Sequence, residues 1–91
     1  MIGFEVSFTK DAWKEYQFFL NNNKRIAERI VLLVNAIAIN PFTGIGKPEP
    51  LKHKYRGYWS RRVDNENRLI YRFIDNITIE IVKCKGHYYD K

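Results

Sequence analysis

The feature that most constrains the fold is a pair of alternating segments joined by a short polar stretch: YWSRRV at 58–63, DNEN at 64–67 and RLIYRFI at 68–74. Side chains along a strand alternate between two faces, so this pattern predicts two strands connected by a turn. Placing Arg62 opposite Arg68 puts Trp59 opposite Tyr71 and collects the apolar side chains on one face. A shift by one residue would mix apolar and charged side chains, so this register is the expected one.

The second face of this hairpin is unusually basic. It carries Ser60 and Arg72, and it sets Arg62 directly opposite Arg68. Like charges in such a pair are destabilising, which suggests a site for an anion. The alternative is that both side chains splay into water. Arg61 falls on the apolar face by parity, and we expect its methylene groups to lie across the aromatic rings.

Two helices are predicted before the hairpin. Thr9 is a suitable N-cap for a helix over 10–20, whose apolar stripe consists of Trp13, Tyr16 and Leu20. A second helix is predicted from Asn23 to about Ile39, with apolar side chains at Ile26, Ile30, Leu33, Val34 and Ile37. We expect both stripes to face the core, and the short NNN turn at 21–23 predicts antiparallel helices.

Further strands are predicted on either side of these elements. FEVSF at 4–8 precedes the helices, LKH at 51–53 forms a short segment, and ITIEIVKCK at 77–85 follows the hairpin. One strand, two helices and a run of antiparallel strands make an α+β pattern, and residues 1–91 fit a single domain. Cys84 lies within the last apolar strand and is expected to be a core thiol rather than a reactive one.

Positive charge is concentrated in one part of the chain. Residues 47–72 contain eight Lys or Arg and three acids, which is +5 of the total +6. Such a block favours contact with a polyanion such as nucleic acid, although a solvated basic face is the simpler alternative. One cysteine and two histidines argue against a disulfide framework or a zinc site, so no metal or other cofactor is expected. No signal peptide and no membrane span are recognisable, which favours the cytoplasm.

One set of residues suggests chemistry: Glu49, Lys52, Arg62, Arg68 and His87. In GKPEPLKH, Glu49 lies between Pro48 and Pro50, which restrict its backbone. A carboxylate, an imidazole and cations suit metal-free RNA cleavage, where the ribose 2′-OH is the nucleophile and the protein supplies a base, an acid and positive charge. Taken singly, Glu49 could pair with Lys47 or Lys52 on the surface, and both His53 and His87 could simply be exposed.

The blocks GKPEPLKH and GYWSRRVDNENRLIYRF and the HY near the end resemble the YoeB/Txe toxins, a branch of the RelE-type bacterial toxin superfamily. The likeness runs through essentially the whole chain in the same order. It implies two N-terminal antiparallel helices packed on a twisted, mainly antiparallel sheet of four to five strands. It also implies the toxin of a type II toxin–antitoxin system, a ribosome-dependent endoribonuclease, or mRNA interferase, that cuts translated mRNA in the A site.

The resemblance also implies roles for individual residues. Glu49 matches the general base, Arg68 the arginine that stabilises the phosphate, and His87 the general acid. Three further residues match RNA-binding positions: Lys52, Arg62 and Tyr88. The implied partners are a cognate antitoxin, the ribosome and mRNA, with a homodimer or a hetero-oligomer with the antitoxin both compatible.

Two other functions stay open at this point. The same basic face could bind RNA or the ribosome without cleaving, or the chain could be a gyrase-inhibiting toxin of the same fold, as in the ParE branch. The ParE branch does not require a Glu–Arg–His set.

Overall fold

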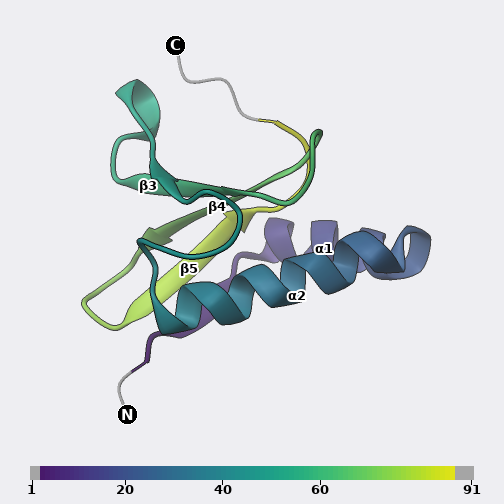
Figure 1. The fold of residues 1–91 in the computed structure, drawn as a ribbon, viewed down its shortest axis with the longest axis horizontal. Coiled ribbons are helices and arrows are strands. Elements are labelled where there is room, and N and C mark those ends of the chain that lie inside the picture. The colour runs from purple at the N-terminus through teal and green to yellow at the C-terminus, as the bar shows by residue number, and fades with distance from the viewer. Residues whose placement is uncertain (1–2, 88–91) are drawn as a thin grey trace.

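The structure is a computed structural model that describes residues 3–87 of the 91-residue chain. Its elements are, in order, β1 (Glu5–Phe8), α1 (Lys10–Asn22), α2 (Lys24–Ile39), β2 (Glu49–Pro50), the 3-10 turn η1 (His53–Tyr55), β3 (Tyr58–Arg62), β4 (Arg68–Phe73) and β5 (Thr78–Lys83). The two helices lie side by side against one face of the sheet (Figure 1). The predicted α+β class is therefore confirmed.

The sheet has five strands in the order β1-β5-β4-β3-β2. β1 runs parallel to β5, and the other neighbouring strands are antiparallel, so the sheet is mainly antiparallel as expected. The predicted hairpin register is also confirmed, because Arg62 lies opposite Arg68 and Trp59 lies opposite Tyr71. We call the sheet face away from the helices the outer face; it carries the two paired arginines.

The helices begin and end where the sequence predicts, within a few residues. The Thr9 hydroxyl accepts a hydrogen bond from the amide of Ala12 at 3.1 Å, and the Asn23 side chain accepts one from the amide of Ile26 at 3.3 Å. Asn23 alone separates the helices, serving as C-cap of α1 and N-cap of α2. Such a short connection returns α2 alongside α1.

The core lies between α2 and the sheet. Three side chains of the predicted α2 stripe are fully buried: Ile30, Leu33 and Ile37. They pack with sheet residues that are equally buried: Leu69, Tyr71, Ile79 and Ile81. Burying each large apolar side chain contributes about 1.5–3 kcal/mol, so this layer supplies much of the stability of the fold.

The stripe predicted for α1 is wrong for two of its three residues, since only Tyr16 is partly buried against the core. The buried residues of α1 are Ala12 and Phe19, whereas Trp13 is 47% exposed and Leu20 is 42% exposed. α1 has apolar side chains on two sides, and the small Ala12 allows close approach to the sheet. The thiol of Cys84 lies 3.5 Å from the Ala12 carbonyl oxygen and is fully buried, as predicted.

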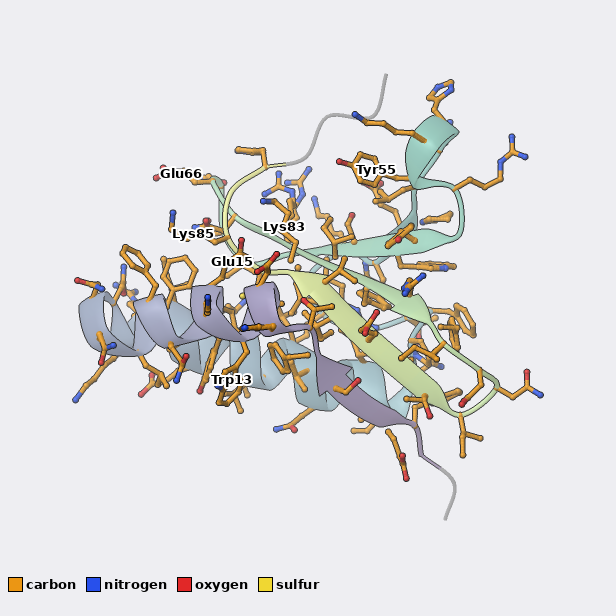
Figure 2. The ribbon with its side chains drawn as sticks, turned by 180° about the vertical axis from the view of Figure 1, so that it is seen from behind. Trp13, Glu15, Tyr55, Glu66, Lys83 and Lys85 are labelled. Atoms are coloured by element: carbon orange, nitrogen blue, oxygen red, sulfur yellow. The ribbon has the colours of Figure 1, made fainter. Side chains whose placement is uncertain are left out.

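A carboxylate on α1 fixes the chain just after β5. Glu15 accepts hydrogen bonds from the backbone amides of Cys84 at 2.8 Å and Lys85 at 3.2 Å. Figure 2 shows Glu15 on α1 beside Lys85 at this end of the sheet. The segment that leads to His87 is therefore anchored to the helix layer as well as to the sheet.

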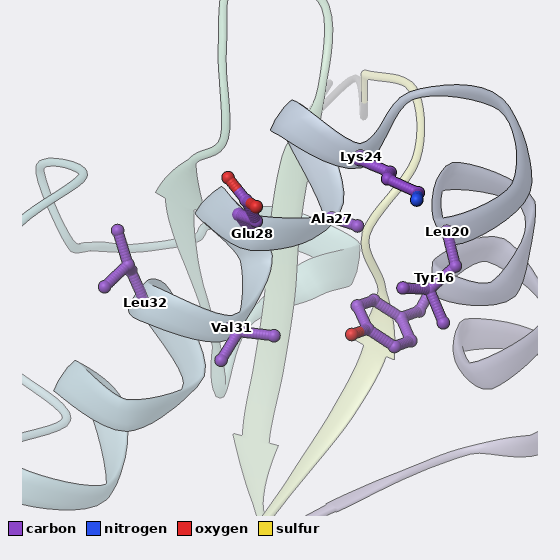
Figure 3. Close-up of a pocket in the computed structure, with 7 residues that line it drawn as sticks. All are labelled: Tyr16, Leu20, Lys24, Ala27, Glu28, Val31 and Leu32. Atoms are coloured by element: carbon purple, nitrogen blue, oxygen red, sulfur yellow. The ribbon is translucent and has the colours of Figure 1, made fainter.

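The exposed side of α1 and the neighbouring side of α2 form an apolar groove of about 460 Å³. Figure 3 shows its lining residues, which are Tyr16, Leu20, Lys24, Ala27, Glu28, Val31 and Leu32. Trp13 lies at an adjoining hollow, where its ring meets that of Phe8 edge to face at 5.6 Å. Trp13 and Leu20, which we expected in the protein core, thus lie at the surface of the helix layer.

The expected strand at 51–53 is also wrong. Strand pairing occurs earlier, where Glu49 lies opposite Ser60 and Pro50 lies opposite Trp59. Proline is tolerated there because β2 is an edge strand, which needs no donor on its open side. The chain then enters η1, where His53 is exposed and adopts a positive φ of 56°. Neither helix within residues 3–87 has the length and apolarity needed to cross a bilayer.

Candidate active site

Arg61 holds the loop that leads to Glu49. The Arg61 side chain is fully buried, and its guanidinium donates to four oxygens: the Asn40 carbonyl at 2.6 Å, the Thr43 carbonyl at 2.9 Å, the Ile45 carbonyl at 3.1 Å and the Tyr71 hydroxyl at 3.2 Å. Parity predicted the correct face for Arg61. It did not predict that the charged end would also be buried, so one cation of the basic block is structural and does not contribute to the surface.

The same loop is fixed a second time at Gly46. The Gly46 carbonyl accepts a hydrogen bond from the amide of Arg62 at 2.7 Å. Gly46 has a φ of +83°, and an added Cβ would lie only 2.8 Å from Cδ2 of Leu33. Pro48 and Pro50 then restrict the backbone on both sides of Glu49. The Glu49 carboxylate is therefore carried by a backbone segment with little freedom, which Arg61 and Gly46 attach to the rest of the fold.

Glu49 itself is exposed on the outer face. It lies opposite Ser60, which makes Arg62 its diagonal neighbour, and such pairs are about 7–8 Å apart between Cα atoms. Within residues 3–87 an ion pair joins Arg72 and Glu80 across neighbouring strands, and Glu49 forms none there with Lys47. Lys52 is exposed and directly precedes η1, three residues beyond Glu49.

The paired arginines are arranged differently. Arg62 is exposed, whereas Arg68 is partly buried and its Nη1 donates to the carbonyl oxygens of Asp64 at 2.7 Å and Asn67 at 3.1 Å. These carbonyl dipoles offset part of the repulsion between the two guanidinium groups. Among residues 3–87, Nε and Nη2 of Arg68 have no hydrogen-bond partner, which leaves one edge of the group for an anion.

Arg72, the third arginine of the outer face, has a different environment. It forms an ion pair of 3.1 Å with Glu80 on the neighbouring strand and lies 5.8 Å from the centre of the Tyr58 ring. Its charge is thus balanced locally. Arg62 and Arg68 are the cations of the hairpin that are placed to attract an anion.

The chain beyond β5 continues beside β4. The amide of Arg68 donates to the carbonyl of Gly86 at 3.0 Å, and the amide of Gly86 donates to Oδ1 of Asn67 at 2.7 Å. His87 follows directly and is exposed. Figure 1 shows the chain turning away from the helices after the end of β5. Tyr88, the remaining predicted site residue, lies outside the described residues.

The structure thus brings most of the predicted residues to one region. Glu49, Arg62 and Arg68 share the outer face, and the segment bearing His87 is hydrogen-bonded to Arg68. Sequence reasoning missed Asp64 and Asn67, which hold Arg68 and Gly86. Their spacing in DNEN, typical of side-chain-stabilised turns, was the available signal. Within residues 3–87, no three His, Cys, Asp or Glu side chains are grouped as a metal site.

Comparison with protein families and curated sequences gives one consistent result. A family model described as "YoeB-like toxin of bacterial type II toxin-antitoxin system" matches residues 8–88. Toxin YoeB of Synechocystis sp. is 48% identical over 84 residues, which cover 92% of this chain and 96% of that protein. Toxin YoeB of Escherichia coli K12 is 40% identical over 84 residues, covering 92% and 99% of the two chains.

Solved structures agree over the same length. A YoeB/ParE toxin from Agrobacterium tumefaciens superposes with a TM-score of 0.87 at 38% identity, covering 92% of this chain and 99% of the other. A YoeB-YefM complex and a YoeB dimer, both from Staphylococcus aureus, give TM-scores of 0.83 at 41% and 40% identity, each covering 93% of this chain and 98% of the other. The similarity therefore includes the elements that carry Glu49, Arg68 and His87.

Proposed function

The chain belongs to the YoeB-like toxin family of bacterial type II toxin–antitoxin systems, and we propose that it is a ribosome-dependent endoribonuclease that cuts translated mRNA in the A site. One observation supports this most strongly. Glu49 and the two opposed arginines lie on the outer face, and the segment that leads to His87 is hydrogen-bonded to the backbone of Arg68. The fold presents these groups on its surface, where a long polymer can reach them.

The proposed reaction is an attack by the ribose 2′-OH on the adjacent phosphate. Glu49 takes the proton of the 2′-OH while the 2′ oxygen bonds to phosphorus. The bond from phosphorus to the 5′ oxygen breaks, and protonated His87 gives its proton to that oxygen, leaving a 2′,3′-cyclic phosphate and a 5′-OH end. Arg68 stabilises the negative charge that builds on the phosphate oxygens through the edge of its guanidinium that faces no protein partner within residues 3–87.

Three further residues are proposed to bind the RNA: Lys52, Arg62 and Tyr88. Arg62 is the exposed member of the arginine pair, next to Arg68 and diagonal to Glu49. A cation at this point would bind the phosphate next to the scissile one and so align the 2′-OH with Glu49.

The chain would be held inactive by a cognate antitoxin. Relatives of this chain have been solved as a YoeB-YefM complex and as a YoeB dimer, which supports an antitoxin partner and oligomer formation here. We expect a C-terminal segment of the antitoxin to lie over Arg62, Arg68 and His87, because acidic side chains there would balance the paired arginines.

Mapping of RNA ends tests the proposal. The chain is induced without its antitoxin in bacteria that express a reporter transcript, and new 5′ ends are located by primer extension. Cuts should occur within the translated frame and disappear when the start codon of the reporter is removed. A module that only binds RNA or the ribosome would produce no new ends, and a gyrase inhibitor would instead change plasmid supercoiling; either result would overturn the proposal.

A further inference from the structure

The turn between β3 and β4 is held by a compact set of hydrogen bonds. The Asp64 carboxylate accepts from the amides of Glu66 at 2.8 Å and Asn67 at 2.7 Å. The side-chain amide Nδ2 of Asn67 donates to the two Asp64 oxygens at 3.0 and 3.3 Å. An ionised carboxylate only accepts hydrogen bonds, so the nitrogen of the Asn67 amide must face Asp64. Its oxygen is therefore fixed in the opposite direction.

That oxygen binds the segment after β5. Oδ1 of Asn67 accepts from the amide of Gly86 at 2.7 Å, and the amide of the next residue, Arg68, donates to the Gly86 carbonyl at 3.0 Å. Gly86 is thus bound on both sides by two consecutive residues of the hairpin. β5 has already ended at Lys83, so these bonds continue the attachment to β4 where regular pairing has stopped.

The same turn also positions Arg68. Nη1 of Arg68 donates to the Asp64 carbonyl at 2.7 Å and to the Asn67 carbonyl at 3.1 Å. One four-residue turn therefore contacts both the guanidinium of Arg68 and the residue that precedes His87. The side chain of Asn67 is the group that joins these two parts.

We infer that Asn67 is a positioning residue, which, held by Asp64, sets the place of His87 relative to Arg68. The inference rests on the proposed function where it concerns cleavage. A displacement of about 1 Å in a reacting group can cost about 10²-fold in rate, so loss of this link should slow the chemical step rather than weaken ribosome binding.

An exchange of the two side chains tests the inference. Asn67→Asp places a second carboxylate against Asp64, which removes the donor and introduces repulsion. The double variant Asp64→Asn with Asn67→Asp restores one donor and one acceptor in reversed order. The new amide oxygen at 64 can still accept from the backbone, and the new carboxylate at 67 can still accept from Gly86. Asn65→Ala, at an exposed position of the same turn, is the matched control.

Single-turnover cleavage of mRNA on programmed ribosomes gives the functional readout. We expect Asn67→Asp to lower the rate at saturating toxin by about tenfold or more, with the half-saturating toxin concentration changed by less than about twofold. The cleavage rate of the double variant should recover to within about threefold of the rate of the unaltered protein. Asn65→Ala should cleave at the rate of the unaltered protein. A normal rate for Asn67→Asp, or a double variant as slow as the single one, would overturn the inference.

Amide hydrogen exchange of the full-length toxin gives a readout that does not depend on cleavage. The Gly86 amide should exchange faster in Asn67→Asp and recover in the double variant, while the Ile81 amide in β5 stays protected in all variants. If the unaltered toxin cuts no RNA, the proposed function fails, and Gly86 exchange alone then decides whether Asn67 holds this segment. Unchanged exchange of Gly86 in Asn67→Asp would contradict the inference in either case.

Discussion

Arg61 and Tyr71 form a buried hydrogen bond of 3.2 Å between β3 and β4, and the same two side chains hold the loop that leads to Glu49. The Tyr71 hydroxyl donates to the Pro41 carbonyl at 2.6 Å, while the Arg61 guanidinium binds three further carbonyl oxygens of residues 40–45. Burial raises the pKa of Tyr71 above its ordinary value of 10.0, so the hydroxyl keeps its proton and remains a donor in alkaline as well as neutral solution. The core thus fixes the loop from which the candidate site is built.

Tyr71→Phe should lower stability without altering the apolar packing of the ring. The substitution leaves the Pro41 carbonyl without its donor and Nε of Arg61 without its acceptor. We expect the free energy of unfolding to fall by about 1–3 kcal/mol, measured by urea denaturation. Tyr58→Phe, on the partly exposed outer face, is the control and should change it by less than about 0.5 kcal/mol. Equal effects of the two variants would contradict this account.

Arg61→Lys should be much more damaging than Arg62→Lys, although both keep the charge. A lysine ammonium cannot bind the four oxygens that surround the Arg61 guanidinium. Leaving buried partners unpaired is expected to cost about 3 kcal/mol or more at position 61. Arg62 is exposed, so its substitution should be nearly neutral for unfolding. Similar unfolding midpoints for the two variants would refute the structural role of Arg61.

Gly46→Ala and Gly57→Ala form a second matched pair. Both glycines have positive φ, +83° and +93°, but an added Cβ would be 2.8 Å from Leu33 at position 46 and in open space at position 57. Each variant should lose about 1–2 kcal/mol from backbone strain, and Gly46→Ala should lose more because Leu33 must move. Thermal unfolding measures the difference. A Gly57 variant less stable than the Gly46 variant would contradict the packing at the loop.

Cys84 should be inert in the folded protein. Burial, assisted by the nearby Glu15 charge, raises the pKa of its thiol to about 12, so almost no thiolate exists at pH 7–8. We expect alkylation by iodoacetamide at pH 8 to be slow in native protein and rapid in urea, followed by mass spectrometry. Rapid alkylation of the native protein would show that the thiol is accessible.

The raised pKa of Cys84 also makes the free energy of unfolding depend on pH. The folded-state pKa of Cys84 exceeds its ordinary value of 9.0, so the stability that the neutral thiol contributes is complete below pH 9 and is lost as the pH rises toward 12. The difference in unfolding free energy between the unaltered protein and Cys84→Ala should therefore narrow between pH 8 and about pH 10.5. A constant difference over this range would contradict the raised pKa.

Much of the fold follows from local patterns in the sequence. The hairpin register is predictable because pairing Arg62 with Arg68 keeps Trp59 and Tyr71 on the same face, whereas a shift by one residue would mix apolar and charged side chains. The α2 stripe is predictable because Ile30, Leu33 and Ile37 follow one another at helical spacing, although Val31 and Leu32 of the same helix are apolar and exposed. α1 is not, because it has apolar side chains on two sides and its closest contact uses the small Ala12.

Parts of the candidate site could not be predicted because they depend on a very short strand and on contacts between segments that are distant in the sequence. β2 has only Glu49 and Pro50, which is too short for an alternating pattern and includes a residue that lacks a donor. Arg61 was predicted on the correct face, but its full burial depends on carbonyl oxygens from a distant loop. The contact of Asn67 with Gly86 joins residues 19 positions apart, so neither turn alone reveals it.

The central claim is that Glu49 and His87 act on the same phosphodiester bond, and the rate of single-turnover cleavage on programmed ribosomes tests it most directly. Glu49→Gln and His87→Gln should each slow cleavage by about tenfold or more while ribosome binding stays largely intact. The matched controls Glu66→Gln and His53→Gln, at exposed positions, should cleave at the normal rate. Normal cleavage by either Glu49→Gln or His87→Gln would contradict the account.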